Sequence, residues 1–319
     1  MIQALNHTLH EAFEKDPKLL TFGEDVGAFG GVFRVTAGLQ KKFGEERCFN
    51  SPLCEQGIIG FGIGIAQKGL RPICEIQFAD YIFPAYDQIV NELAKMRYRT
   101  GGQYTAPVVI RTPYGGGIRG GHYHSQSPES QFTHTPGLNV VFVSSPYDAK
   151  GLLNTALKSP DPVLFFEPKR IYRAIKEEVP ETYYEIPFGQ ADVAKLGDDV
   201  TLIGWGAQHH QNMQAALELE AEGVGVEVIN LRTLVPLDID TVAHSVRKTG
   251  RCVIAHEAPV TSGFGAELLS RIMETCFWSL EAPIKRCCGL DTPFPNSWEE
   301  EYLPDAPKVK EAIIETIRE

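Results

Sequence analysis

The sequence predicts an α/β protein made of two doubly wound domains with mainly parallel sheets. Nearly continuous apolar runs alternate with longer amphipathic stretches along the whole chain, as expected when buried parallel strands alternate with covering helices. The length of 319 residues favours two domains. A polar, acidic segment from Lys176 to Pro187, interrupted by prolines, is the best candidate for a linker. We therefore expect domains at residues 1–180 and 188–319.

The first half begins with an amphipathic helix, MIQALNHTLHEAFEKD, which is followed by a strand at LLTFGEDV and a glycine-rich turn. One helix is expected from Gly38 to Phe43 and a second from Glu55 to Lys68. The strand RPICEIQF precedes a long helix from Pro84 to Tyr98. The runs PVVIRTPYG, NVVFVSSP and PVLFFEPK are further strand candidates, because each is almost continuously apolar.

The second half repeats this alternation more regularly. Strands are expected at VTLIGWG, GVEVINL, CVIAHE and IKRCCG. The helices between them are expected from His209 to Glu222, from Ile239 to Lys248 and from Gly265 to Phe277. The first two end beside a glycine, which favours a helix C-terminus. These patterns predict the type of each element and leave the strand order open.

The composition excludes some classes of function. A formal net charge of −11 argues against a nucleic-acid-binding protein, which normally carries a basic patch. The seven cysteines include no CxxC pair, which favours reduced thiols over disulfides or zinc ligands. No apolar run approaches the roughly 20 residues that cross a bilayer, and the first helix is acidic rather than a targeting signal. We expect a soluble protein of the bacterial cytoplasm.

Glu55 begins a segment that combines glycines with large apolar residues, EQGIIGFGIGIAQKG. Each glycine inside a helix costs roughly 0.5–1 kcal/mol relative to alanine, so the glycines at positions 57, 60, 62 and 64 require compensation. Close backbone contact with another element, such as at a subunit interface, would supply it. From the residues alone, Glu55 is either an acid that only favours the helix N-terminus or a functional carboxyl beside an apolar wall.

A loop with five glycines, from Gly115 to Gly121, precedes two histidines in HYHSQSPE. The loop lacks GxxxxGK[ST], and no GxGxxG opens a helix after the first strand. A mobile active-site loop is therefore favoured over a phosphate-binding or dinucleotide-binding loop. Histidine exchanges protons near neutral pH, so a structural role and a catalytic role are both open for His122 and His124.

Ordered motifs along the chain carry a resemblance to a known family: PLCEQG, EIQFADYIFPA, DQIVNE, RYRTGG, GGGIRGGHYHSQSPE, FFEPKRIYR, NLRTLVPLDIDTV, HEAP and GLDTPFP. They resemble the beta subunits of 2-oxo-acid dehydrogenases, above all the branched-chain group, which are transketolase-like thiamine-diphosphate enzymes. The similarity runs from residue 1 to residue 319. It implies a pyrimidine-binding domain followed by a transketolase C-terminal-like domain.

The resemblance also implies roles for individual side chains. Glu55 falls on the catalytic glutamate that hydrogen-bonds a pyrimidine nitrogen of thiamine diphosphate and so assists removal of the thiazolium C2 proton. Tyr81 matches an aromatic residue packed against the pyrimidine ring, and Gln77 matches a polar residue nearby. His124, which precedes SQ, matches the histidine that assists acyl transfer to lipoyl-lysine, and His122 is a flanking residue.

Thiamine enzymes hold the metal of the diphosphate with a GDG sequence, and this chain has none; Gly197-Asp198-Asp199 is the nearest. The resemblance therefore implies that an alpha subunit brings this site and its Mg²⁺ within an alpha2beta2 heterotetramer. It further implies a lipoyl-bearing dihydrolipoyl acyltransferase core as acyl acceptor. It also implies a potassium ion, held mainly by backbone oxygens of Val108, Val109, Ala156, Ser159 and Asp161.

The expected reaction is oxidative decarboxylation of a 2-oxo acid with reductive acylation of lipoyl-lysine. EIQFADYIFPA and HSQSPE resemble the branched-chain group more than the pyruvate group, and a pyruvate dehydrogenase beta subunit is the alternative. A transketolase-like transferase is disfavoured because it would carry both binding halves in one longer chain. The absence of a GxGxxG sequence after the first strand disfavours a nicotinamide-dependent oxidoreductase. The joint presence of Glu55, Tyr81 and His124 disfavours a non-catalytic scaffold.

Overall fold

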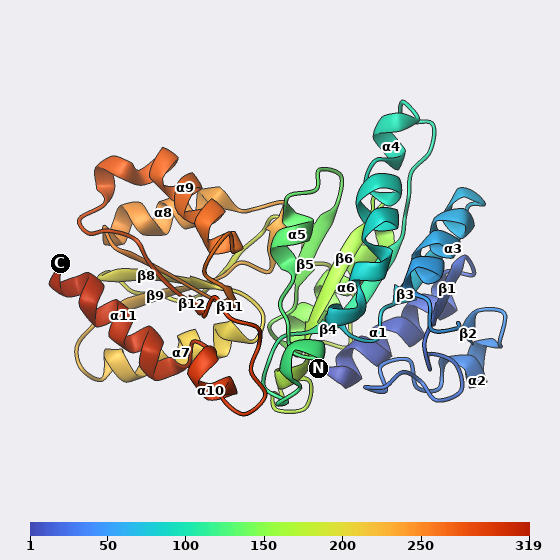
Figure 1. The fold of residues 1–319 in the computed structure, drawn as a ribbon, viewed down its shortest axis with the longest axis horizontal. Helices are drawn as coiled ribbons and strands as arrows, with labels where there is room; N and C mark the ends of the chain where they lie inside the picture. Colours follow the sequence, from blue (N-terminus) through green and yellow to red (C-terminus); the bar gives the residue numbers. More distant parts are fainter.

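The computed structural model describes residues 1–319, whose strands form two separate sheets (Figure 1). The strand order is β10-β5-β6-β4-β3-β1-β2 in the first sheet and β12-β11-β8-β9-β7 in the second. All neighbouring strands run parallel except the pairs β10–β5 and β7–β9. The prediction of an α/β fold with two mainly parallel sheets is therefore confirmed.

The strands of the first sheet are β1 (Leu19–Gly23), β2 (Cys48–Asn50), β3 (Arg71–Glu75), β4 (Val109–Tyr114), β5 (Asn139–Phe142), β6 (Val163–Pro168) and β10 (Thr233–Val235). Those of the second sheet are β7 (Asp192–Lys195), β8 (Val200–Gly204), β9 (Val226–Asn230), β11 (Cys252–Pro259) and β12 (Lys285–Gly289). Three further helices are short: α2 (Leu39–Phe43), α5 (Glu129–Thr133) and α10 (Glu299–Tyr302).

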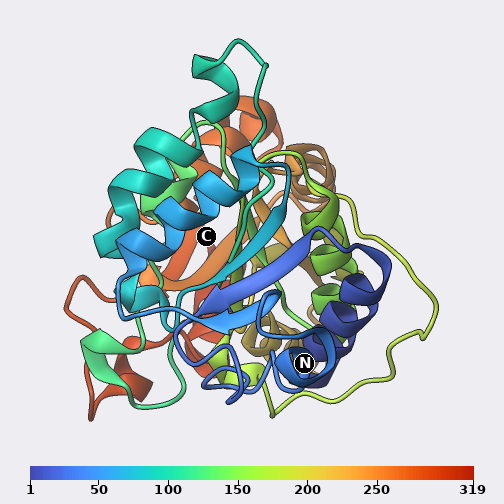
Figure 2. The same ribbon diagram turned by 90° about the vertical axis from the view of Figure 1, so that its right-hand side faces the viewer.

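Helices cover both faces of the first sheet. Helices α1 (Ile2–Lys15) and α6 (Pro146–Lys158) pack on one face, and α3 (Glu55–Gln67) with the helical stretch up to α4 (Met96–Arg99) packs on the other (Figure 2). Successive residues of a strand point to opposite faces. Leu19 accordingly joins the core under α1 and α6, whereas Leu20 joins the core under α3.

The second sheet is covered in the same way. Helices α7 (Gln208–Glu220) and α11 (Ala306–Arg318) bury side chains such as Leu202 on one face. Helices α8 (Ile239–Thr249) and α9 (Phe264–Cys276) bury Ile203 and Ile254 on the other. None of the helices combines the length and the apolar character that a bilayer crossing requires, and all seven cysteines are unpaired.

Two differences from the expectations concern the hydrogen-bonding pattern. The long helix expected from Pro84 to Tyr98 is a 3-10 turn at Phe83–Ala85, a π-helix at Gln88–Leu93 and the short helix α4. Apolar spacing predicts a buried helical face, but it does not distinguish these hydrogen-bonding patterns. Strand β10, which follows β9 of the second sheet in the sequence, pairs with β5 at the edge of the first. No local pattern encodes such a long-range pairing.

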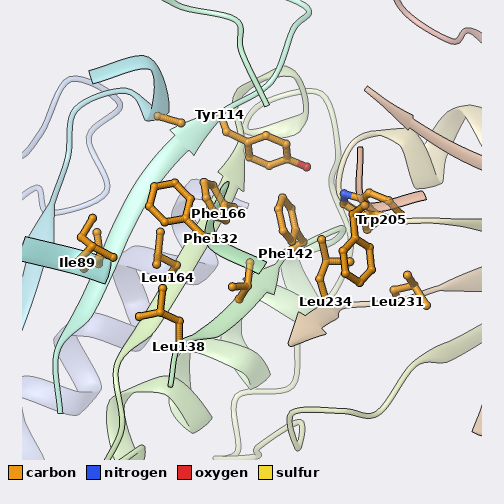
Figure 3. Close-up of a cluster of buried hydrophobic side chains, with 14 of the residues drawn as sticks. Ile89, Tyr114, Phe132, Leu138, Phe142, Leu164, Phe166, Trp205, Leu231 and Leu234 are labelled. Carbon is orange, nitrogen blue, oxygen red and sulfur yellow. The ribbon is translucent and has the colours of Figure 1, made fainter. Parts of the chain in front are cut away.

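A continuous apolar core joins the two sheets (Figure 3). Phe142 stacks on Phe166 with ring centroids 4.8 Å apart, and it meets the ring of Trp205, from the second domain, at 6.4 Å. Tyr114, the last residue of β4, packs edge-on against both phenylalanines. The shared core therefore holds the second domain against the end of β4, where the glycine loop begins.

Candidate active site

Three charged side chains on adjacent strands of the first sheet form a buried network. Arg111 donates Nη1 to Glu75 Oε2 at 2.8 Å and donates Nε and Nη2 to the two oxygens of Glu167 at 2.7 and 2.8 Å. The hydroxyl of Tyr172 donates to Glu167 as well. Burial and, less strongly, Glu167 raise the pKa of Glu75, against the opposing pull of Arg111. These groups satisfy one another and leave little bonding capacity for a ligand.

Glu24 and Glu55 are carboxyls without such partners. Glu24 directly follows β1 and is 5% exposed, yet neither of its oxygens has a hydrogen-bond partner. Burial, and secondarily the charge of Glu55, raises the pKa of Glu24 to about 7. Glu55 is the first residue of α3 and is half-buried. Glu24 can therefore hold a proton near neutral pH, and its two free oxygens can bond a polar ligand.

The outer face of α3 lies open beside Glu55. A Cβ added at Gly60 or Gly64 would meet no atom within 4 Å, whereas one added at Gly62 would lie 2.6 Å from Cys74 Sγ. Phe61 is 54% exposed although it is a large aromatic residue. Gly62 thus permits close packing on the sheet, and the free glycines fit the subunit interface that the sequence predicts.

Tyr81 and His124 meet directly. The Tyr81 hydroxyl and His124 Nε2 lie 2.8 Å apart and share a hydrogen bond. The ring of Phe78 packs edge-on against both, at centroid distances of 5.7 Å to Tyr81 and 4.7 Å to His124. Burial raises the pKa of Tyr81, and the charges of Asp80, Glu24 and Glu55 add to this effect. Residues from α3, the turn after β3 and the glycine loop therefore converge on one region.

Gln77 lies at the edge of this region. Its Nε2 donates to Asp25 Oδ2 at 3.2 Å, and Asp25 has a left-handed backbone with φ of 58°. The side chain thus ties the turn after β3 to the turn after β1. His122, in contrast, is exposed, and its ring is tilted by 43° against that of Tyr123.

The structure adds two side chains that the sequence patterns did not single out. Asp80 Oδ1 accepts the backbone N–H groups of Ser125 and Gln126 at 3.1 and 2.9 Å, which fixes the chain next to His124. Glu24 is the other. The sequence position of Glu24 does point to a ligand site, because an acid directly after a buried parallel strand lies at the sheet edge where ligands of α/β proteins bind.

The five residues expected to bind potassium lie near the opposite ends of the strands. Val108 and Val109 are at the start of β4, Ala156 is near the end of α6, and Ser159 and Asp161 follow it. The Val108 carbonyl accepts Val163 N–H at 3.0 Å, and Arg71 Nη2 donates to the Ser159 carbonyl at 2.9 Å. A potassium ion bound there would lie in the same loop as the guanidinium of Arg71, which already donates to the Ser159 carbonyl. No group of three or more His, Cys, Asp or Glu side chains in the chain is arranged to hold a metal.

The buried His256 and the half-buried Cys288 form a neutral pair in the second domain. His256 Nε2 lies 3.1 Å from Cys288 Sγ, and its ring stacks on Trp205 with centroids 5.2 Å apart. Burial lowers the pKa of His256 to about 4 and raises the pKa of Cys288 to about 12. A neutral thiol beside a buried imidazole is a packing arrangement rather than an activated nucleophile.

Two family models match the chain. "Transketolase, pyrimidine binding domain" matches residues 1–175, and "Transketolase, C-terminal domain" matches residues 189–309. Among solved structures, one described as "Split gene transketolase, inactive beta4 tetramer" has a TM-score of 0.79, covers 99% of this chain and 97% of its own, and is 24% identical. The fold is therefore that of the transketolase-like enzymes, and sequence relatives define the branch.

The 2-oxoisovalerate dehydrogenase subunit beta 2, mitochondrial, of Arabidopsis thaliana is 57% identical over 318 residues, which cover 99% of this chain and 88% of that protein. The 2-oxoisovalerate dehydrogenase subunit beta of Pseudomonas aeruginosa is 47% identical, with coverages of 98% and 93%. The pyruvate dehydrogenase E1 component subunit beta of Acholeplasma laidlawii is 48% identical, with coverages of 97% and 95%. The chain belongs to the 2-oxo-acid dehydrogenase beta subunits of the transketolase-like, thiamine-diphosphate-dependent family.

Proposed function

We propose that this chain supplies the pyrimidine half of the active site of a 2-oxo-acid dehydrogenase that acts on a branched-chain 2-oxo acid. The main observation behind this proposal is that Glu24 and Glu55 lie near each other without a counter-ion, beside the open face of α3. The branched-chain preference is supported by relatives named 2-oxoisovalerate dehydrogenase that reach 57% identity. A relative named for pyruvate dehydrogenase, at 48%, keeps pyruvate as the alternative substrate.

The side chains present fit the pyrimidine end of thiamine diphosphate. When bound, this cofactor supplies the nucleophilic carbon that adds to the 2-oxo group and accepts the electrons released with CO₂. Glu55 hydrogen-bonds a ring nitrogen and exchanges a proton with it. Tyr81 offers an aromatic surface to the ring, and Gln77 holds the adjoining turns together. Proton exchange is efficient when the pKa lies near the working pH, and Glu24 beside Glu55 meets that condition.

His124 serves the second half-reaction, in which the acyl group moves to a lipoyl dithiolane. The sulfur that leaves must gain a proton, and imidazole delivers one near neutral pH. The hydrogen bond between His124 Nε2 and the Tyr81 hydroxyl couples this residue to the side chain proposed to face the pyrimidine. His124 therefore lies where it can protonate a lipoyl group entering from the glycine-loop side.

The remaining half of the site belongs to partners. An alpha subunit holds the diphosphate and its Mg²⁺ within an alpha2beta2 heterotetramer, and a dihydrolipoyl acyltransferase core presents the lipoyl group.

A potassium ion near Ser159 and Asp161 stabilises the assembly, and replacing potassium by a large organic cation should then lower its melting temperature. Because the similar proteins include mitochondrial and bacterial ones, the bacterial cytoplasm is likewise a proposal.

The decisive experiment separates the two half-reactions in a complex reconstituted with its alpha subunit. His124→Ala should reduce lipoyl-dependent turnover about 10²–10⁴-fold, while decarboxylation followed with dichlorophenolindophenol should change several-fold at most. His122→Ala, two residues away and exposed, is the matched control. Equal losses in both assays would remove the acyl-transfer role from His124.

Substrate choice is tested on the same complex. We expect kcat/KM for 3-methyl-2-oxobutanoate to exceed that for pyruvate, because a relative named for 2-oxoisovalerate dehydrogenase reaches 57% identity, whereas the relative named for pyruvate dehydrogenase reaches 48%. A higher value for pyruvate would establish the alternative.

A further inference from the structure

The glycine loop that carries His124 is bound by carboxylates of the second domain. Glu257 Oε2 accepts the N–H of Gly116 at 3.0 Å. The two carboxylate oxygens of Glu299 accept the N–H groups of Gly117 and Arg119, the latter at 2.7 Å. Glu257 lies in β11 and Glu299 begins α10, so the acids stand 141, 180 and 182 positions further along the chain than the groups they bind.

The backbone of this loop is shaped to receive an anion. Gly117 has a φ of 92° and Arg119 a φ of 55°, both left-handed, which turns nearby N–H groups toward one point. Such concave arrays of N–H groups bind phosphates and other anions in many proteins. The carboxylate of Glu299 occupies this position. The glycine-rich loop therefore binds an internal carboxylate in this structure.

Steric contacts show that the loop and the second domain fit closely. A Cβ at Gly115 would lie 2.6 Å from Glu257 Oε2, and one at Gly116 would lie 2.8 Å from Phe294 and 3.0 Å from Leu303. Phe294, Leu303 and Tyr302 form a small apolar cluster of their own next to Glu299. The absence of side chains at these glycines is what permits the contact.

A buried cation accompanies these acids. Lys169 is 5% exposed, and its Nζ has no hydrogen-bond partner. Burial lowers the pKa of Lys169 to about 8, whereas the charges of Asp80, Glu257 and Glu299 act in the opposite direction. These three acids accept N–H groups of the segment from Gly116 to Gln126, which contains most of the glycine loop and His124. The loop is thus held at both ends by carboxylates around one lysine.

We propose that Glu299 and Glu257 are positioning residues for His124, so that the second domain sets the geometry of acyl transfer. This inference rests on the proposed role of His124. The second domain shows no catalytic group of its own, but its carboxylates fix the loop whose histidine meets Tyr81 at 2.8 Å. Glu299 is the more telling residue, since a single carboxylate accepts two N–H groups.

The test uses Glu299→Gln in the reconstituted complex, because an amide has only one acceptor oxygen and turns its NH₂ toward the other N–H. Glu300→Gln is the matched control: this neighbour is exposed, and its carboxylate pairs only with the Arg119 side chain, at 3.3 Å. Hydrogen exchange of the peptide containing Gly117 to His124 should accelerate about tenfold or more in Glu299→Gln and stay unchanged in Glu300→Gln.

Turnover supplies the second readout. Lipoyl-dependent turnover of Glu299→Gln should fall about tenfold, with dye-linked decarboxylation and the melting temperature nearly unchanged, and Glu299→Asp should recover part of the loss. Unchanged loop exchange, or equal losses in both assays, would overturn the inference. A wild-type complex without lipoyl-dependent turnover would instead refute the proposed function, and the exchange comparison would still decide whether Glu299 orders the loop.

Discussion

Two groups of carboxyl side chains lie side by side at the edge of the first sheet. In one, the complete group, the carboxyls share a cation; in the other, the incomplete group, they have no counter-ion. Glu75 and Glu167 share the guanidinium of Arg111, are bonded within 2.8 Å and are shielded from solvent. Glu24 and Glu55 have no counter-ion, although Glu24 is almost as buried. A folded chain rarely leaves buried carboxyls unpaired unless a ligand or partner completes them. The first group therefore stabilises the fold, and the second is the group that we propose to serve cofactor binding and chemistry.

The contrast extends to the surfaces next to these groups. The strands around Arg111 are covered on both faces, whereas the outer face of α3 exposes Gly60, Phe61 and Gly64. Helical glycines cost stability unless another backbone approaches closely. Because the carboxyls without a counter-ion lie beside the exposed face of α3, we infer that one partner subunit covers this face and completes the carboxyl site.

The largest expected effect is the loss of function on removing the partner. The isolated chain should show no measurable 2-oxo-acid decarboxylation and should bind thiamine diphosphate weakly, because it contains only the pyrimidine half of the site. Calorimetric titration of the chain with and without its alpha subunit measures this. Tight stoichiometric binding of thiamine diphosphate by the chain alone would show that Glu24 and Glu55 need no partner subunit to form a binding site.

Replacement within the incomplete group should be the next largest effect. Glu55→Gln should slow exchange of the cofactor C2 proton in the reconstituted complex by about 10²–10⁴-fold, since an amide cannot cycle a proton. Folding should be preserved because the half-buried side chain forms no hydrogen bond in the isolated chain. Exchange followed by NMR is the measurement. Glu46→Gln, an exposed acid in the same domain, is the control, and similar rates for both variants would contradict the assignment.

Replacement within the complete group should damage stability instead. Arg111→Met leaves two buried carboxylates without their cation and should reduce the free energy of unfolding by about 3–5 kcal/mol. Urea denaturation of the isolated chain measures it. Arg97→Met removes an exposed ion pair with Asp161 and should cost about 0–1 kcal/mol. Comparable losses for the two variants would show that the buried network contributes no special stability.

The smallest effect concerns pH. Because the pKa of Glu24 is raised to about 7 in the folded chain, the folded state binds a proton that the unfolded state releases at lower pH. Its contribution to stability is therefore present at acidic pH and lost as pH rises through 7. Glu24→Gln should flatten this dependence, by on the order of 1 kcal/mol between pH 5 and 8 after solvent screening. Thermal melts of both proteins across that range check it, with Glu46→Gln as the unchanged control.

The fold class and most elements follow from local sequence patterns. Continuous apolar runs predict β4, β5 and β6, and the helix predicted from Glu55 differs from α3 by one residue at its end. The helix up to Tyr98 was predicted as regular and is a π-helix in its middle. Its apolar spacing reflects burial on the sheet, which both hydrogen-bonding patterns satisfy.

The sequence by itself also indicated Glu55, Gln77, Tyr81 and His124, because each lies in a motif of the family. Only the tertiary structure decided how they are supported. The hydrogen bond of Tyr81 to His124 joins residues 43 positions apart, and Glu299 reaches the glycine loop from 180 positions away. Motifs record which side chains are present. Contacts between distant segments depend on how two sheets pack through a shared core, which no local pattern encodes.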